Sequence, residues 1–240
     1  MSVDIGNIGS SAQLVGANTE ADTYSATVTV SAGSVLLIAH SYAFNSGVAA
    51  NTPTLDDSSS VSTLLGKTSA GSGDHHLNLW WCAPTAGSRT VSLTQSRYAR
   101  GNLVLVELTG ADTMTPFGTP ATTASSGNSP SVNVTSMGAD DLALAFSIVS
   151  GCDAGWSLIV PGRTEGAGQT SLFDRSSNDA QGNYRDIYTS ISATHGTGSV
   201  AVSYTYTGAP FYLLAGVRVI AASGGGGSVA KSVPWFFLNQ

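Results

Sequence analysis

Hydrophobic and polar residues alternate in short stretches along much of the chain. In the segment 90–94, Val91 and Leu93 would point to one side, while the hydroxyl residues between them would point to the other. The segment 200–206 repeats this alternation with Val and Tyr residues. A period of two is that of a β-strand with one buried face and one face in water. The pattern therefore predicts strands.

We expect strands throughout, because no stretch of eleven or more residues has helical periodicity. The clearest are short, rich in β-branched and aromatic residues, and bounded by Gly, Ser, Asn or Pro. Two of them are almost continuously apolar, which suits strands covered on both faces. The predicted strands are Thr27–Val30, Val35–His40, Leu77–Cys82, Thr90–Thr94, Leu103–Leu108, Val132–Thr135, Leu142–Val149, Ile187–Ser192, Val200–Tyr206 and Phe211–Ile220.

The first half of this pattern returns in the second half. VTVSAGSVLLIAHSY (28–42) resembles VNVTSMGADDLALAFSIV (132–149), and residues 89–110 resemble residues 198–219. Strands at this spacing without intervening helices indicate a sandwich or a barrel. We interpret the chain as two copies of one all-β unit.

The two copies, about 25–111 and 130–222, are expected to form a single domain, 1–222. A unit of four or five strands alone would expose an apolar face, and packing two units face to face buries both faces. The predicted fold class is therefore all-β, an antiparallel jelly-roll-like β-sandwich built from two pseudo-repeated halves. The Pro-, Ser- and Thr-rich segment 112–131 is expected to be an extended crossover.

The second copy carries extra residues. VSTLLGKT (61–68) is similar to WSLIVPGRT (156–164), and beyond this point the offset between the copies grows. The extra residues are assigned to the polar stretch 172–186, and added surface loops commonly carry function. The candidate recognition residues of this insert are Phe173, Asp174, Arg175, Asn178, Asp179, Asn183, Tyr184 and Arg185.

The residues after Ala222 form a tail. SGGGGS (223–228) has the composition of a flexible linker and leads to an aromatic cluster. This cluster could fold back onto its own sandwich or dock on another chain, and aromatic side chains are good anchors. The candidate anchor residues are Trp235, Phe236, Phe237 and Leu238.

Charge and composition narrow the classes of function. Charged residues make up 10 % of the chain, against about 25 % in typical soluble domains. The surface must carry Ser, Thr, Asn and Gly instead, as is common in extracellular, adhesive and virion proteins. The net charge is −6 and no basic cluster exists beyond Arg97 and Arg100, which disfavours binding to nucleic acid.

Targeting signals are also missing from the pattern. No run reaches the roughly 18 apolar residues of a membrane span, so no membrane partner is expected. The N-terminus lacks the basic start and apolar stretch of a signal peptide, which predicts synthesis in a cytoplasm. Cys82 and Cys152 are expected to be unpaired core residues, and a disulfide between them is the less favoured alternative.

Candidate chemical groups give no catalytic or metal motif. Asp74, His75 and His76 cluster, but adjacent residues on a strand point to opposite faces and two ligands do not make a zinc site. No serine lies in a nucleophile elbow. The acidic pairs at 56–57 and 140–141 lack EF-hand spacing, and a calcium site of Asp174, Asp179 and Asp186 is disfavoured. We expect no cofactor.

Two adjacent tryptophans, Trp80 and Trp81, raise the question of a sugar-binding platform. They cannot both face one core from one strand, so one of them is a candidate exposed aromatic or interface residue. Trp156 takes the place of Val61 of the first copy, which favours core packing for Trp156.

Four segments together resemble a known family of domains. They are LWWCAPTAGSRTVSLT (79–94), NLVLVELTGAD (102–112), GADDLALAF (138–146) and GWSLI (155–159). Their order is similar to that of a jelly-roll-like β-sandwich family found in tailed-phage virion proteins and bacterial surface proteins. The resemblance spans residues 25–222 and implies an attachment or decoration module on a particle. It implies nothing about the insert or the tail.

The leading functional hypothesis is a structural protein of a tailed-phage virion, a capsid decoration or cement protein that stabilises the particle through subunit contacts. Its partners would be the phage major capsid protein or other virion proteins. Further copies of the chain would form a homo-oligomer, and a trimer suits the local three-fold positions of a capsid. The protein would be located in the virion after synthesis in the host cytoplasm.

Two other hypotheses stay open. A tail-fibre or receptor-binding module would recognise surface glycans with the insert and with Trp80 or Trp81. A polysaccharide-active enzyme on a jelly roll would need paired carboxylates in a cleft, and the scattered acids give no such pair. The sequence therefore favours a protein that is not an enzyme.

Overall fold

The computed structural model describes residues 1–13, 23–43, 50–70, 75–96, 100–150, 162–177, 187–207 and 210–223. Within these residues every regular element is a strand and every pairing is antiparallel, which confirms the predicted all-β class. The strands are β1 (Asp4–Gln13), β2 (Thr23–Val30), β3 (Val35–Ala43), β4 (Thr54–Leu55), β5 (Ser62–Ala70), β6 (His75–Cys82), β7 (Gly87–Thr94), β8 (Arg100–Thr109), β9 (Ala121–Ser126), β10 (Ser131–Met137), β11 (Leu142–Ser150), β12 (Arg163–Glu165), β13 (Thr170–Ser177), β14 (Ile187–His195), β15 (Gly198–Tyr206) and β16 (Phe211–Val219).

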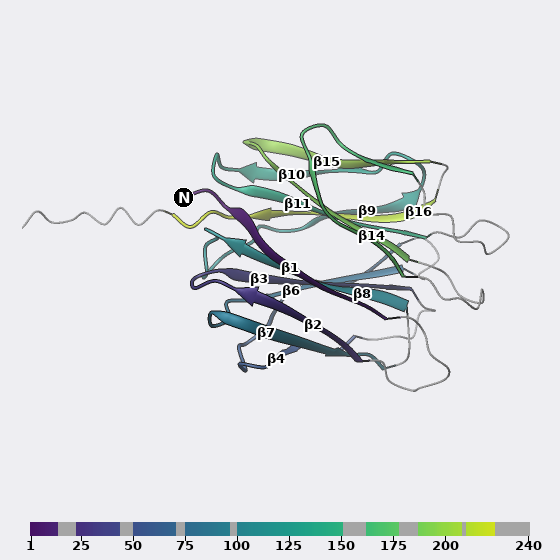
Figure 1. Cartoon of the computed structure of the whole chain (residues 1–240). Coiled ribbons are helices and arrows are strands. Elements are labelled where there is room, and N and C mark those ends of the chain that lie inside the picture. The colour runs from purple at the N-terminus through teal and green to yellow at the C-terminus, as the bar shows by residue number, and fades with distance from the viewer. Residues whose placement is uncertain are drawn as a thin grey trace, which may run out of the picture.

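The strands form four stacked layers (Figure 1). In the first half, the five-stranded sheet β1-β8-β3-β6-β5 packs on the three-stranded sheet β2-β7-β4. In the second half, the sheet β13-β14-β11-β16-β9 packs on β10-β15-β12. Adding eight to each strand number of the first half gives the sheet orders of the second half. Each half is thus a two-sheet sandwich of eight strands. The sequence pattern had predicted that each half would be one unit of four or five strands, packed face to face with the other.

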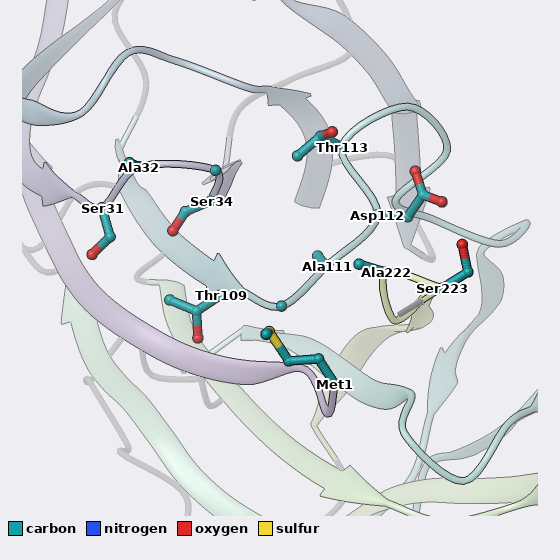
Figure 2. Close-up of a pocket in the computed structure, with 12 residues that line it drawn as sticks. Met1, Ser31, Ala32, Ser34, Thr109, Ala111, Asp112, Thr113, Ala222 and Ser223 are labelled. Carbon is teal, nitrogen blue, oxygen red and sulfur yellow. The ribbon is translucent and has the colours of Figure 1, made fainter. Parts of the chain in front are cut away.

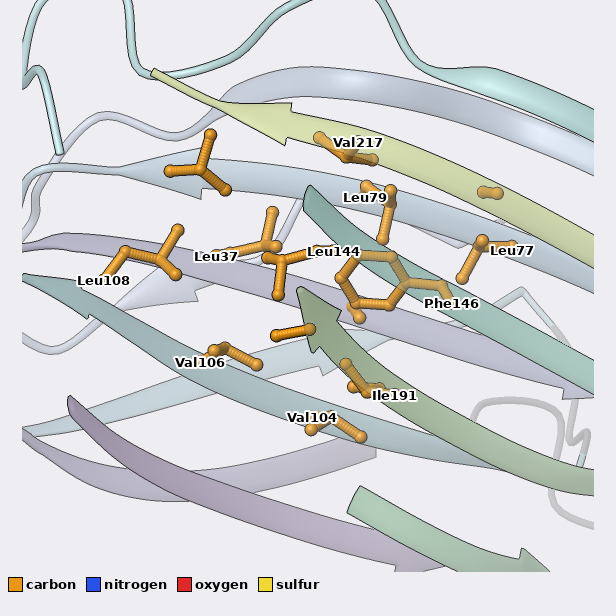
Figure 3. Packing of buried hydrophobic residues seen from close by; sticks show 14 of the residues in the cluster. Leu37, Leu77, Leu79, Val104, Val106, Leu108, Leu144, Phe146, Ile191 and Val217 are labelled. Carbon is orange, nitrogen blue, oxygen red and sulfur yellow. The ribbon is translucent and has the colours of Figure 1, made fainter. Parts of the chain in front are cut away.

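Three hydrophobic cores separate the four layers. The largest lies between the two five-stranded sheets and joins the halves, with Leu37 of β3 opposite Leu144 and Phe146 of β11 (Figure 3). On the other face of β3, Leu36 and Ile38 fill the core of the first half. The five-stranded sheets are covered on both faces, which explains their continuously apolar strands. The jelly-roll topology and the origin of the two halves as pseudo-repeats stay predictions.

The two adjacent tryptophans of β6 enter different cores. Trp80 is 4 % exposed and packs in the core of the first half. Trp81 points to the opposite face, is half-buried against the core between the halves, and meets Phe117 edge to face with 6.1 Å between ring centroids. Trp80 is therefore not the exposed aromatic residue, because both faces of its sheet are covered, and Trp81 is the remaining candidate of the two.

The insert assigned to 172–186 begins inside a strand. Residues 170–177 form β13, which pairs with β14 as β5 pairs with β6 in the first half. Residues 61–68 belong largely to β5, whose place in the sheet order is taken by β13. Of the segment 156–164, only residues 162–164 are described, and Arg163 and Thr164 belong to β12. Within the insert assigned from the sequence, the part that exceeds its counterpart is the connection after β13, residues 178–186 against 71–74.

The two halves are tied together at one end of the molecule. The N–H of Val3 donates to the carbonyl of Asp140 at 2.9 Å, and the N–H of Ala222 donates to the carbonyl of Gly110 at 2.8 Å. The N-terminus and the last described residue, Ser223, both lie here (Figure 1). We call this the terminal end and the opposite end the polar end.

Candidate functional site: a band of buried polar side chains

All three cores become polar at the end where β3, β7 and β11 finish and β6, β8 and β14 begin. At this polar end the strands place hydroxyl, amide and imidazole groups where apolar side chains fill the rest of the core. Each of these residues is at most 5 % exposed. The residues are His40, Ser41, His75, His76, Asn78, Gln95, Asn102, Ser147, Thr189 and Ser190.

In the first half, four rings form a column at the polar end of the core. Tyr24 meets His40 edge to face at 4.7 Å, His40 stacks on Tyr42 at 4.9 Å, and Tyr42 lies 4.8 Å from His76. Burial lowers the pKa of His40 to about 3 and, despite a hydrogen bond with Asn78, raises the pKa of Tyr42 to about 12. Both side chains are therefore neutral at pH 7.

Between the halves, Thr189 of β14 joins two strands of the other half. Its hydroxyl lies 2.7 Å from the hydroxyl of Ser41 on β3 and accepts a hydrogen bond of 2.9 Å from the amide of Asn102 on β8. His75 lies at the same end of this sheet, and burial lowers its pKa to about 4. A polar contact thus fixes the register of the two halves where the apolar packing ends.

In the second half, Arg163 closes the gap between two edge strands. It lies on β12 and donates to Glu165 on its own strand and, at 2.6 Å, to Asp174 on β13 of the facing sheet. The Arg163 side chain is 8 % exposed, and its guanidinium carbon lies 5.6 Å from the ring centroid of Tyr204 and 6.0 Å from that of Tyr188. Burial and the Asp174 carboxylate raise the pKa of Tyr188.

Several buried atoms of this band, together with Nε of Arg163, have no hydrogen-bond partner among the described residues. Leaving such a group unsatisfied costs roughly 1–3 kcal/mol, so their concentration at one end is unusual for a purely structural core. These unpartnered atoms belong to neutral side chains, apart from Arg163, and include both hydrogen-bond donors and acceptors. The atoms are His40 Nδ1, His75 Nε2, Asn78 Nδ2, Gln95 Oε1, Asn102 Oδ1 and Arg163 Nε.

The terminal end has a different character. A hollow of about 500 Å³ lies there, lined by Met1, the turn 31–34, residues 109–113 and Ala222–Ser223 (Figure 2). Beneath the turn, the buried carboxylate of Glu107 accepts hydrogen bonds from Ser31 and Ser34. Ser223, the residue from which the tail continues, lies on the rim of this hollow.

The structure separates the residues that the sequence placed in the insert. Phe173 is half-buried against the core between the halves, Asp174 binds Arg163 and accepts a hydrogen bond from Ser190 at 3.1 Å, and Arg175 is exposed. The remaining predicted site residues lie outside the described part of the chain. They are Asn178, Asp179, Asn183, Tyr184, Arg185, Trp235, Phe236, Phe237 and Leu238.

Sequence reasoning missed most of the polar band. Arg163 and Glu165 are two residues apart on one strand, and this spacing was an available signal for a charged pair on one face. Asn102 and Thr189 come from different halves, and no local pattern joins them. Cys82 is a buried free thiol whose pKa burial raises to about 12, in agreement with an unpaired core residue; Cys152 lies outside the described residues.

Comparison of the chain with protein-family models, with curated proteins and with solved structures found no match. The described residues contain no group of three or more His, Cys, Asp and Glu side chains placed to hold a metal ion. They also contain no helix with the length and apolar character needed to cross a membrane.

Proposed function

We propose that the protein is a structural component of a tailed-phage virion, a capsid decoration or cement protein that attaches through its C-terminal tail. The observation that carries this proposal is the place where the tail starts. The last described residue, Ser223, lies on the rim of the hollow at the terminal end, and a glycine-rich linker and the aromatic residues 235–238 follow.

The architecture supports a mechanical role. Two sandwiches share one large core and are tied again at the terminal end, so a pull on the tail acts on β16, a central strand of its sheet. A linker of this composition would let the aromatic residues reach a neighbouring chain. Residues 235–238 would bind a partner chain as aromatic anchors, and the paired sandwiches would then be held on the particle surface.

The test compares three proteins for binding to purified virions by co-sedimentation. They are the full chain, a chain ending at residue 222, and a full-length variant in which residues 235–238 are replaced by Ser. We expect both altered proteins to fold as the wild type and to lose attachment. Equal attachment of the truncated protein would refute the tail anchor, and absence of the full chain from purified virions would refute the virion role.

A second candidate function is recognition of surface glycans at the polar end. The observation that supports it is the contact of Arg163 with Asp174 and Tyr188. These two residues lie on β13 and β14, the strands that the connection 178–186 joins. A glycan array probed with the wild type and with an Asp174→Asn variant tests this function. Glycan binding that the variant loses would favour recognition over decoration, and an array without signal would remove this candidate.

A further inference from the structure

The edge strands of the two five-stranded sheets differ in regularity. The edge strands β1, β5 and β13 each carry a register shift in their pairing with the adjacent strand. Strand β9 pairs with β16 in unbroken register from Phe211↔Ser126 to Gly216↔Ala121. Bulges, charges and covering segments are the devices by which proteins keep an edge strand from pairing with another chain. Strand β9 has no bulge.

The strand that takes the place of β9 in the first half is covered. Strand β1 leans onto β2, where the side chain of Asn7 donates to the carbonyl of Thr29 at 3.0 Å. The backbone of Thr27 leaves no room for a side chain at Gly9. Within the described residues, β9 forms no hydrogen bond to a strand other than β16, although it lies near β10.

The backbone groups of β9 that face outward follow from the hydrogen bonds at its end. The N–H of Gly127 donates to the carbonyl of Pro210 on the β16 side at 3.1 Å. In an antiparallel pair, every second residue has its N–H and C=O directed to the same neighbour. Residues 121, 123 and 125 therefore bond to β16, and the N–H and C=O groups of Thr122, Ala124 and Ser126 point away from the sheet.

The side chains of β9 suit pairing with an identical strand. The segment ATTASS (121–126) has no charge, so two copies bring no like charges together. Thr122, Ala124 and Ser126 are exposed, and Phe211, directly opposite Ser126 on β16, is 50 % exposed. Small residues on the edge beside an exposed ring leave room for a second strand, and that strand would also cover part of the ring.

We propose that β9 is a self-association edge, at which two copies of the chain pair their β9 strands antiparallel across a two-fold axis through Ala124. In this register Thr122 of one copy faces Ser126 of the other, and each outward-facing pair exchanges two backbone hydrogen bonds. The two five-stranded sheets then become one continuous sheet through the dimer. The proposal is independent of the virion role.

The experiment measures the mass of the full-length protein by sedimentation equilibrium. We expect a dimer for the wild type and a monomer for both Ala124→Pro and Ala124→Lys. Proline removes an N–H that does not bond to β16, which an edge strand tolerates. Lysine places two like charges across the axis. The matched control is Ala124→Ser, which should stay dimeric, and circular dichroism should be the same for all four proteins.

Cross-linking tests the register. Two Ala124→Cys chains would place Cα atoms about 5.5 Å apart, within disulfide range, so oxidation should give a covalent dimer. Thr113→Cys, at the terminal end, is the control and should stay monomeric under denaturing conditions. A trimeric wild type, or a dimer that persists in Ala124→Lys, would overturn the proposal. A monomeric wild type would also overturn it, and this is the result expected if β9 pairs with a different protein.

Discussion

Replacing Glu107 by Gln should destabilise the protein through loss of a single buried carboxylate. Glu107 lies on β8 and is 0 % exposed. One carboxylate oxygen accepts from the N–H of Ser31 at 2.5 Å and the hydroxyl of Ser34 at 3.0 Å, and the other accepts twice from Asn7 at 2.8 Å. It also fills the space beside Gly6, where a side chain would not fit. This carboxylate therefore holds edge strand β1 and the turn between β2 and β3.

The size of the effect follows from the donors left without an acceptor. A Gln side chain keeps one oxygen and turns its amide N–H₂ toward donors that the carboxylate bound. A buried donor that loses its charged partner costs roughly 1–3 kcal/mol, and two such donors are affected, which gives about 2–4 kcal/mol after relaxation of the serine hydroxyl. For a chain of this length, that corresponds to a fall in Tm of roughly 5–15 °C.

The pH dependence gives the more specific test. Burial alone would raise the pKa of Glu107, but hydrogen bonds from Ser31, Asn7 and Ser34 outweigh it and lower the pKa from 4.5 to about 2. A lowered carboxyl pKa means that the stabilisation is complete above about pH 4.5 and is lost as the pH falls toward 2. The difference in unfolding free energy between wild type and Glu107→Gln should therefore shrink across this range.

Urea unfolding between pH 7 and pH 2 measures this difference. The matched control is Asp112→Asn, which removes the same charge from a half-buried residue whose carboxylate accepts hydrogen bonds from the backbone N–H groups of Met114 and Thr115. We expect little change in Tm for this control. A Glu107→Gln variant that melts within about 1 °C of the wild type, or a stability difference that does not depend on pH, would refute the reasoning.

Four further substitutions test the cores. Between pH 7.5 and 5.5 the unfolding free energy of the wild type should fall by about 1.4 kcal/mol more than that of His40→Phe, because a neutral buried histidine with a pKa of about 3 must gain a proton on unfolding. An equal fall in both proteins would contradict a buried neutral imidazole. Trp80→Ala should cost about 3–5 kcal/mol in urea unfolding, and Trp81→Ala less; the reverse order would be inconsistent with their burial. Thr189→Val should cost roughly 1–3 kcal/mol by the same assay, and a neutral result would mean that its hydroxyl does not couple the halves.

Runs of apolar residues predicted the central strands well. Strands β3, β8, β11 and β16 are covered on both faces, so their sequences are apolar enough to be recognised without a structure. Edge strands do not give this signal. Strand β9 has exposed Thr and Ser, which is why the sequence suggested a crossover there instead of a strand.

The polar band could not be predicted in the same way. A histidine within an apolar strand fits a satisfied core position as well as a site, and His40 is told apart only by the rings of Tyr24 and Tyr42 on either side. Thr189 meets Ser41 because two separate sandwiches pack together, and no spacing within either half encodes this contact. Contacts between the halves therefore need the structure.

The two halves share one strand order and differ mainly in how their sheet edges are closed. In the first half, the Glu107 carboxylate fastens β1, and that strand covers β2. In the second half, Arg163 fastens the opposite edge by joining β12 to β13, while β9 stays regular, uncharged and exposed. Two halves with the same strand order need similar apolar packing in their cores, but their sheet edges can carry different side chains and contacts. The differences that distinguish one half from the other are therefore concentrated at the edges, and β9 is the edge that a second chain can extend.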